Sequence, residues 1–180
     1  MNLERFYWLA ILIAVIWAVQ GVNLISGYAL NDWFGLIPRS IGGLDGVVMM
    51  PFLHGSLSHI ASNTVPLVVL GGLLTLTAPR LILQASAIVV VFGGLGLWLF
   101  GASAIHVGAS GLIFGWFGFL VTRGLIEKRP LPLLVAIGVA FFYGTMIWGL
   151  LPGQPGVSWE AHLFGCLAGV FAGYALRSRA

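Results

Sequence analysis

Four polar side chains in this sequence could together perform nucleophilic catalysis, and each lies near the start of an apolar stretch. Ser110 is flanked by small residues, and His162 lies far downstream of it. A serine hydroxyl needs an adjacent base to become a nucleophile at neutral pH, and histidine is the usual base. His59 and Asn63 are four residues apart, hence on one helical face, and could donate hydrogen bonds to an oxyanion.

The composition predicts that these side chains belong to a membrane protein. Hydrophobic residues make up 59% of the 180 residues and charged residues only 7%, whereas soluble domains carry about 25% charged residues. So few charges cannot cover a surface that faces water, which excludes a soluble protein. A single cysteine, Cys166, excludes an internal disulfide and is most simply a small residue in a helix interface.

The apolar stretches predict an all-α fold with six membrane spans. A bilayer core about 30 Å thick requires roughly 20 apolar residues per helix. Little sequence is left for a soluble domain, so residues 1–180 are expected to form a single membrane domain. The expected spans cover approximately residues 7–30, 60–78, 81–100, 110–123, 131–151 and 159–176.

The basic residues predict the orientation of these spans. Only Arg39 lies on the side of the odd-numbered loops, and the others share the side of the two termini: Arg5, Arg80, Arg123, Lys128, Arg129, Arg177 and Arg179. The positive-inside rule then predicts that both termini are cytoplasmic. Because the second, fourth and sixth spans begin on the outer side, the four candidate side chains are expected in one leaflet. Charges at span ends mark topology and indicate no nucleic-acid partner.

The fourth span is expected to be short, since residues 110–123 rise only about 20 Å in a helix. With Arg123 at the cytoplasmic interface, Ser110 would lie below the outer surface. Non-helical backbone at that depth must be buried in protein or line a wet cavity. The glycines of the preceding segment, residues 101–111, therefore predict a re-entrant loop.

Two rows of glycine predict that the helices of Ser110 and His162 lie in contact. Small residues at helical spacing let membrane helices approach closely. The rows are Gly111, Gly115 and Gly118 on the fourth span, and Gly165, Gly169 and Gly173 on the face of His162. Contact between them would bring the hydroxyl and the imidazole together.

Each feature also has a plainer interpretation. A serine between glycines is usually a packing residue, and a lone histidine near a helix end is more often interfacial. His54, His59 and His106 suggest a metal site, but a five-residue spacing puts the first two on different faces and no carboxylate or thiol joins them. No metal or other cofactor is therefore expected. Glu160 lies only two residues before His162, which favours a Ser–His dyad over a triad.

Three motifs follow one another along approximately residues 51–173: His54-x4-His59-x3-Asn63 followed by Gly71-Gly72, then Gly108-Ala109-Ser110-Gly111, then Ala161-His162-x2-Gly165-x3-Gly169. In this order and spacing they resemble the motifs of the rhomboid intramembrane serine proteases. The resemblance implies the six-helix rhomboid core, with Ser110 as nucleophile and His162 as general base and then acid. It also implies an oxyanion hole of His59, Asn63 and the Ser110 backbone N–H, and Gly108, Gly111, Gly115, Gly165 and Gly169 are expected to pack helices.

Two positions depart from the family pattern. Where the family commonly has a tyrosine packed on the catalytic histidine, this chain has Phe114, so the aromatic ring is kept and a hydroxyl is lost. A Trp-Arg pair often found in the first outer loop is replaced by the segment 44–50, which leaves the anchoring of that loop open. The pair Pro38-Arg39 lies in the same loop but is not taken as its equivalent.

The expected function is therefore an intramembrane serine endopeptidase that cleaves transmembrane protein substrates near their outer membrane boundary. Family inference adds that the substrate helix enters sideways, past the fifth span. The alternatives are a catalytically silent rhomboid-like protein that binds membrane clients, and a small transporter or channel, although no charged pairs at mid-membrane favour the latter. The short termini and six-span core predict a bacterial inner membrane, and the oligomeric state stays open.

Overall fold

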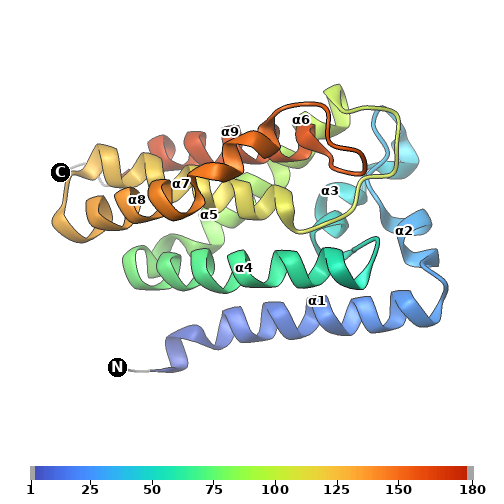
Figure 1. Cartoon of the computed structure of the whole chain (residues 1–180), viewed down its shortest axis with the longest axis horizontal. Coiled ribbons are helices and arrows are strands. Elements are labelled where there is room, and N and C mark those ends of the chain that lie inside the picture. Colours follow the sequence, from blue (N-terminus) through green and yellow to red (C-terminus); the bar gives the residue numbers. More distant parts are fainter. Residues whose placement is uncertain (1–2, 178–180) are drawn as a thin grey trace.

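The computed structural model describes residues 3–177, so Arg179 of the charge pattern lies outside the described residues. Within this range every regular element is a helix, apart from one isolated antiparallel bridge between Leu36 and His106. The main helices, shown in Figure 1, are α1 (Tyr7–Ile25), α2 (Ala29–Phe34), α3 (Gly46–Met49), α4 (Leu57–Thr77), α5 (Ile82–Ile88), α6 (Gly94–Phe100), α7 (Ser110–Glu127), α8 (Pro130–Tyr143) and α9 (Trp159–Ala175).

Among the described residues, four helical segments are long and apolar enough to cross a membrane: Leu3–Ile25, Leu57–Thr77, Pro79–Phe100 and Pro130–Leu150. The third joins α5 to α6 through a π-helical turn, Val89–Gly93, and the fourth joins α8 to a 3-10 segment, Gly144–Leu150. The protein is therefore an integral membrane protein with a polytopic helical fold.

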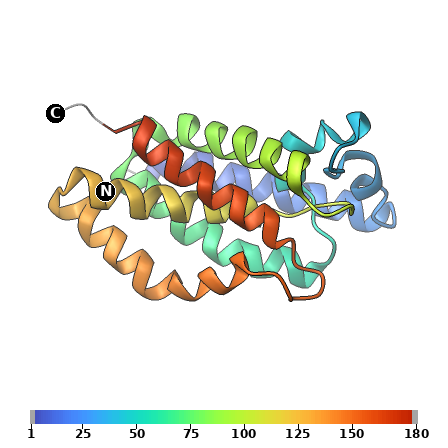
Figure 2. The same ribbon diagram turned by 90° about the horizontal axis from the view of Figure 1, so that it is seen from above.

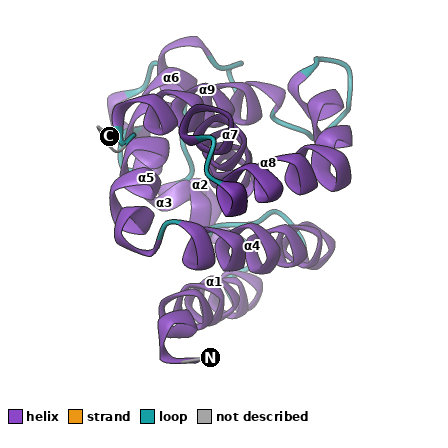
Figure 3. Cartoon of the chain, turned by 90° about the vertical axis from the view of Figure 1, so that its left-hand side faces the viewer, coloured by secondary structure: helices purple, strands orange, loops and turns teal. Residues whose placement is uncertain are grey.

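Helix α7 lies at the centre of the bundle. In the end view of Figure 3, α5, α6, α9 and α8 surround it, and α4 separates it from α1. Helices α8 and α9 both flank it, which Figure 2 shows from above. Eleven of its eighteen residues are buried, among them Trp116 and Phe119, neither of which is exposed at all.

Helices α7 and α9 meet backbone to backbone along their glycine rows. A Cβ added at Gly165 would collide with the carbonyl oxygen of Gly111, and one at Gly169 with that of Gly115. Further along, a Cβ at Gly118 would lie 2.6 Å from the carbonyl oxygen of Cys166. Only glycine permits so close an approach, so these residues set the distance between the two helices.

The starts of α4, α7 and α9 lie at the end of the bundle opposite the start of α1 (Figure 1). Helices α2 and α3 and the long connections lie at this same end. This arrangement brings the polar residues at the beginnings of three helices to one end of the molecule.

Arg39 anchors the first long connection, which lacks the Trp-Arg pair. Its guanidinium donates hydrogen bonds to the carbonyl of Gly101 at 2.7 Å and to the Ser103 hydroxyl at 2.9 Å. Its backbone N–H donates to the carbonyl of Trp98, whose indole N–H donates in turn to the Ser40 carbonyl. A Trp and an Arg from different parts of the chain therefore hold this connection against the end of α6.

Two helix ends differ from the expected spans. Helix α1 stops at Ile25 and not near residue 30, because Gly27 and Tyr28 adopt left-handed backbone conformations. Helix α7 continues past Arg123 to Glu127, where the two side chains form an ion pair at 2.7 Å. At 18 residues α7 rises about 27 Å rather than the expected 20 Å.

Candidate active site

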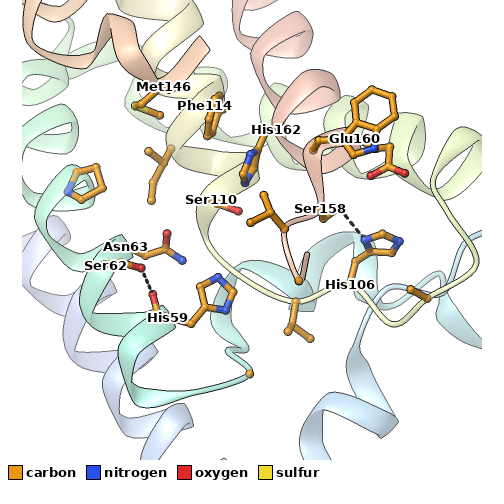
Figure 4. A pocket seen from close by; sticks show the side chains of 18 of the residues that line it. His59, Ser62, Asn63, His106, Ser110, Phe114, Met146, Ser158, Glu160 and His162 are labelled. Atoms are coloured by element: carbon orange, nitrogen blue, oxygen red, sulfur yellow. Dashed lines mark hydrogen bonds between the residues drawn. The ribbon is translucent and has the colours of Figure 1, made fainter. Parts of the chain in front are cut away.

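A cavity of about 860 Å³ opens among the starts of α4, α7 and α9. Its lining includes all four candidate side chains, Ser110, His162, His59 and Asn63. These residues come from distant parts of the sequence, between positions 59 and 162. Figure 4 shows Ser110 beside His162, with His59 and Asn63 on the neighbouring helix α4. The structure thus gathers the four side chains in one cavity.

Ser110 is the first residue of α7, and Gly108 determines how the chain reaches it. Gly108 has a φ of 128°, which side-chain-bearing residues rarely adopt. A Cβ at this position would also lie 2.8 Å from both Cε1 and Nε2 of His59. Gly108 therefore lies in a loop against an imidazole and not between helices, which differs from its expected packing role.

The His162 ring is held by a stacked aromatic ring and by one hydrogen bond. Phe114, one turn into α7, lies parallel to it, with ring centroids 4.1 Å apart and an interplanar angle of 8°. The Nδ1 atom lies 2.9 Å from the carbonyl oxygen of Gly149. Because a carbonyl only accepts, Nδ1 must carry the proton, so Nε2 of the neutral ring keeps its lone pair.

Ser110 and His162 are neighbours in the cavity without being bonded to each other. Within residues 3–177, no hydrogen bond joins their side chains, and the one hydrogen-bond partner of the His162 side chain is the Gly149 carbonyl. Catalytic hydrogen bonds are often long before substrate binds. The lone pair on Nε2 and the hydroxyl of Ser110 are therefore both available for a reaction.

The two side chains from α4 lie across the cavity from His162. The hydroxyl of Ser56 caps α4 by accepting a hydrogen bond from the His59 backbone N–H at 3.1 Å, which fixes the first turn of the helix. Asn63 is buried, and its Nδ2 atom makes no hydrogen bond to any described residue. Asn63 also lines the cavity, and an amide donor without a partner could bind a negatively charged oxygen there.

Sequence reasoning missed several groups that shape this site. The Gly149 carbonyl carries no signal in the sequence, because every residue has one. His54 belongs to the first family motif, where no role is assigned to it, and His106 is considered only for a metal site. In the structure His54 Nε2 accepts a hydrogen bond from the Ala109 backbone N–H at 3.4 Å, and His106 contacts Ser158 at 2.7 Å. The motif was a signal for His54, whereas for His106 the only signal was its position in the loop before Ser110.

Comparison with known proteins identifies the family. Residues 42–179 match the rhomboid domain. Uncharacterized proteins of Mycobacterium tuberculosis and Mycobacterium bovis are each 41% identical to this chain over 173 residues, which is 91% of this chain and 72% of theirs. An uncharacterized protein of Mycobacterium leprae is 35% identical over 173 residues, 91% of this chain and 68% of its own length. The resemblance seen in the motifs is thereby confirmed, and this chain belongs to the rhomboid family.

Proposed function

We propose that this protein is an intramembrane serine endopeptidase that cleaves transmembrane helices near their outer membrane boundary. The observation that carries the proposal is the His162 ring, which is stacked on Phe114 and hydrogen-bonded through Nδ1, beside Ser110 in one cavity. A neutral imidazole held in this tautomer presents Nε2 as a base, which is what a serine nucleophile requires.

The proposed reaction uses the four cavity side chains in turn. The Ser110 hydroxyl attacks the scissile carbonyl while Nε2 of His162 takes its proton, and the same nitrogen then protonates the leaving amine. His59, the Asn63 amide and the Ser110 backbone N–H stabilise the negative oxygen of the tetrahedral intermediate. Water then hydrolyses the acyl-enzyme, with His162 again as base.

We also propose that the substrate reaches the cavity between α4 and α8. An apolar groove of about 690 Å³ lies between these helices, bordered by Val69 and Leu73 on one side and Leu134 and Val139 on the other. Tyr143 lines both this groove and the cavity that contains Ser110. A substrate helix in the groove would therefore reach Ser110 without crossing the protein core.

The membrane orientation is part of the same proposal. Helices α7 and α9 would cross the bilayer with the four long segments, completing six spans and a re-entrant segment before Ser110. Both termini would be cytoplasmic, with the cavity opening on the outer side of a bacterial inner membrane. The basic residues near the start of α1 and the ends of α4, α7 and α9 support this orientation.

Cleavage of a single-span substrate by purified protein in detergent tests the proposal. Wild type should cut near the outer boundary of the substrate helix, whereas Ser110→Ala and His162→Ala should lose cleavage while their unfolding curves stay unchanged. A fluorophosphonate should label Ser110 in wild type only. Cleavage that persists in Ser110→Ala would refute the nucleophile, and an inert Ser110 without cleavage would favour the client-binding alternative.

A further inference from the structure

We propose that His106 is a positioning residue for the reaction. Through the hydroxyl of Ser158, it ties the loop that leads to Ser110 to the first turn of α9, which carries His162. This inference rests on the proposed function, since it concerns the mutual placement of the nucleophile and the base. Neither His106 nor Ser158 belongs to the three family motifs.

The hydrogen bonds of His106 define its tautomer. Its Nε2 lies 3.0 Å from the carbonyl oxygen of Ala102, and its Nδ1 lies 2.7 Å from Ser158 Oγ, as the dashed line in Figure 4 shows. The carbonyl can only accept, so Nε2 donates, and in the neutral ring Nδ1 then accepts from the Ser158 hydroxyl. His106 thus receives one hydrogen bond from the α9 side and gives one within its own loop.

Ser158 makes this contact relevant to His162. It is the N-cap of α9, and its Oγ also accepts a hydrogen bond from the Ala161 backbone N–H at 3.3 Å. Its carbonyl oxygen accepts from the His162 backbone N–H at 3.3 Å. One residue therefore joins His106 to the helical turn that presents the base.

The loop side of the contact is equally fixed. His106 is 6% exposed, and its backbone N–H and C=O both bond to Leu36 in the antiparallel bridge. The neighbouring Ala102 bonds to His106 through its carbonyl and to the Glu160 carboxylate through its N–H, at 3.2 Å. Loop 101–109 and the start of α9 are therefore joined at two points.

This connection matters because no hydrogen bond between described side chains sets the distance from Ser110 to His162. The backbones that carry them must set it instead. The glycine rows fix how closely α7 and α9 approach, while the His106–Ser158 contact fixes the loop before α7 relative to the first turn of α9. A small misplacement of reacting groups reduces the rate of the chemical step more than it weakens substrate binding.

Two conservative variants separate the two hydrogen bonds of His106. His106→Asn retains an acceptor near the position of Nδ1, whereas His106→Gln retains a donor near the position of Nε2. In the single-span cleavage assay, normalised to folded protein, His106→Gln should lower kcat about tenfold with KM unchanged, and His106→Asn should stay within about twofold of wild type. Equal losses in both variants, or an unchanged kcat in His106→Gln, would overturn the proposal.

A second measurement does not depend on activity. Thermal unfolding midpoints are measured for His106→Gln, Ser158→Ala and the double variant. The shift of the double variant should be clearly smaller than the sum of the two single shifts, because both single changes break the same contact between His106 and Ser158. Additive shifts would contradict the contact itself. If wild type neither cleaves substrate nor is labelled at Ser110, the proposed function fails. The unfolding midpoints of the two single variants and the double variant still decide whether His106 and Ser158 are coupled.

Discussion

Helices α7 and α8 are neighbours with opposite environments. Eleven of the eighteen residues of α7 are buried, but only Ala136 and Val139 of the fourteen residues of α8 are. Helix α7 carries Ser110 and contacts its neighbours through glycines, whereas α8 exposes large side chains such as Phe141, at 79%. The helix that would perform chemistry is thus fixed on all sides, and the helix beside the groove is not.

The difference suggests a division of labour within one small bundle. A reacting group must be held precisely, so it belongs on the most buried helix. A helix that yields to an incoming substrate should bury few residues, because little packing is then lost when it moves. Close contacts of α8 with α7 lie in the first half of α8, since a Cβ at Gly124 would collide with the Pro132 carbonyl and with Ala136.

The largest expected effect comes from adding one methyl group at the packed contact of α7 with α9, and the same group on α8 serves as its comparison. Gly169→Ala puts a Cβ into the carbonyl of Gly115 and should lower the free energy of unfolding by about 3 kcal/mol. Gly138→Ala, on α8, meets open space and should be neutral or stabilising by up to about 1 kcal/mol. Unfolding in detergent measures both, and equal effects would contradict the comparison.

A pH-dependent change in stability is expected from a residue beside the start of α7 and not from α8. Burial, and then the neighbouring His59, lowers the pKa of His54 from 6.5 to about 4, and its ring accepts from Ala109 at the start of α7. The unfolded chain then binds more protons than the folded chain between about pH 6.5 and pH 4. Stability should therefore fall as the pH drops through this window, by up to about 2 kcal/mol at pH 5. Unfolding midpoints at pH 7 and pH 5 test this, and His54→Gln should flatten the difference; an unchanged slope would exclude His54 as the cause.

Filling the groove beside α8 should impair substrate access and leave the chemistry intact. Gly138→Trp narrows the groove, and kcat/KM for a transmembrane substrate should fall about tenfold, while fluorophosphonate labelling of Ser110 stays at the wild-type rate. Gly21→Trp, on α1 and also in open space, is the matched control. A loss of labelling in Gly138→Trp would show that α8 is coupled to the reaction centre.

The smallest effect is expected for the ring stacked on His162. Phe114→Ala removes an aromatic contact worth about 0.5–1.5 kcal/mol, so kcat should fall roughly two- to tenfold. Phe114→Tyr restores the side chain that is commoner in the family and should remain within about twofold of wild type. A full loss of activity in Phe114→Ala, with the fold intact, would mean that the ring does more than orient His162.

The family, the helical fold and the choice of four candidate side chains could be predicted from the sequence. These side chains are Ser110, His162, His59 and Asn63. Spacing on a helix and charge at span ends are local properties, so they can be read without knowing the fold. Helix α7 extends one turn past Arg123, the expected end of the span, and the ion pair of Arg123 with Glu127 lies in this added turn.

Other features depend on contacts between distant segments. The bond between His106 and Ser158 joins residues 52 apart, and the contacts of Arg39 span about 60 residues. Neither pair has a spacing that indicates contact. Backbone partners such as the Ala102 carbonyl are still harder to predict, because every residue offers the same group.

The Gly149 carbonyl has a consequence for how this site tolerates heritable change. In a Ser-His-Asp triad a point mutation can delete the carboxylate that orients the histidine. Here the orienting oxygen is backbone, and no codon change can remove it. In mutational scanning, a substitution at position 149 would act only through steric conflict and not by removing the carbonyl. An added Cβ would lie 3.0 Å from Phe114 and 3.2 Å from His162 Nδ1. A backbone ester in place of the amide between residues 149 and 150, made by semisynthesis, would weaken the Gly149 carbonyl as an acceptor and so separate its contribution from side-chain bulk.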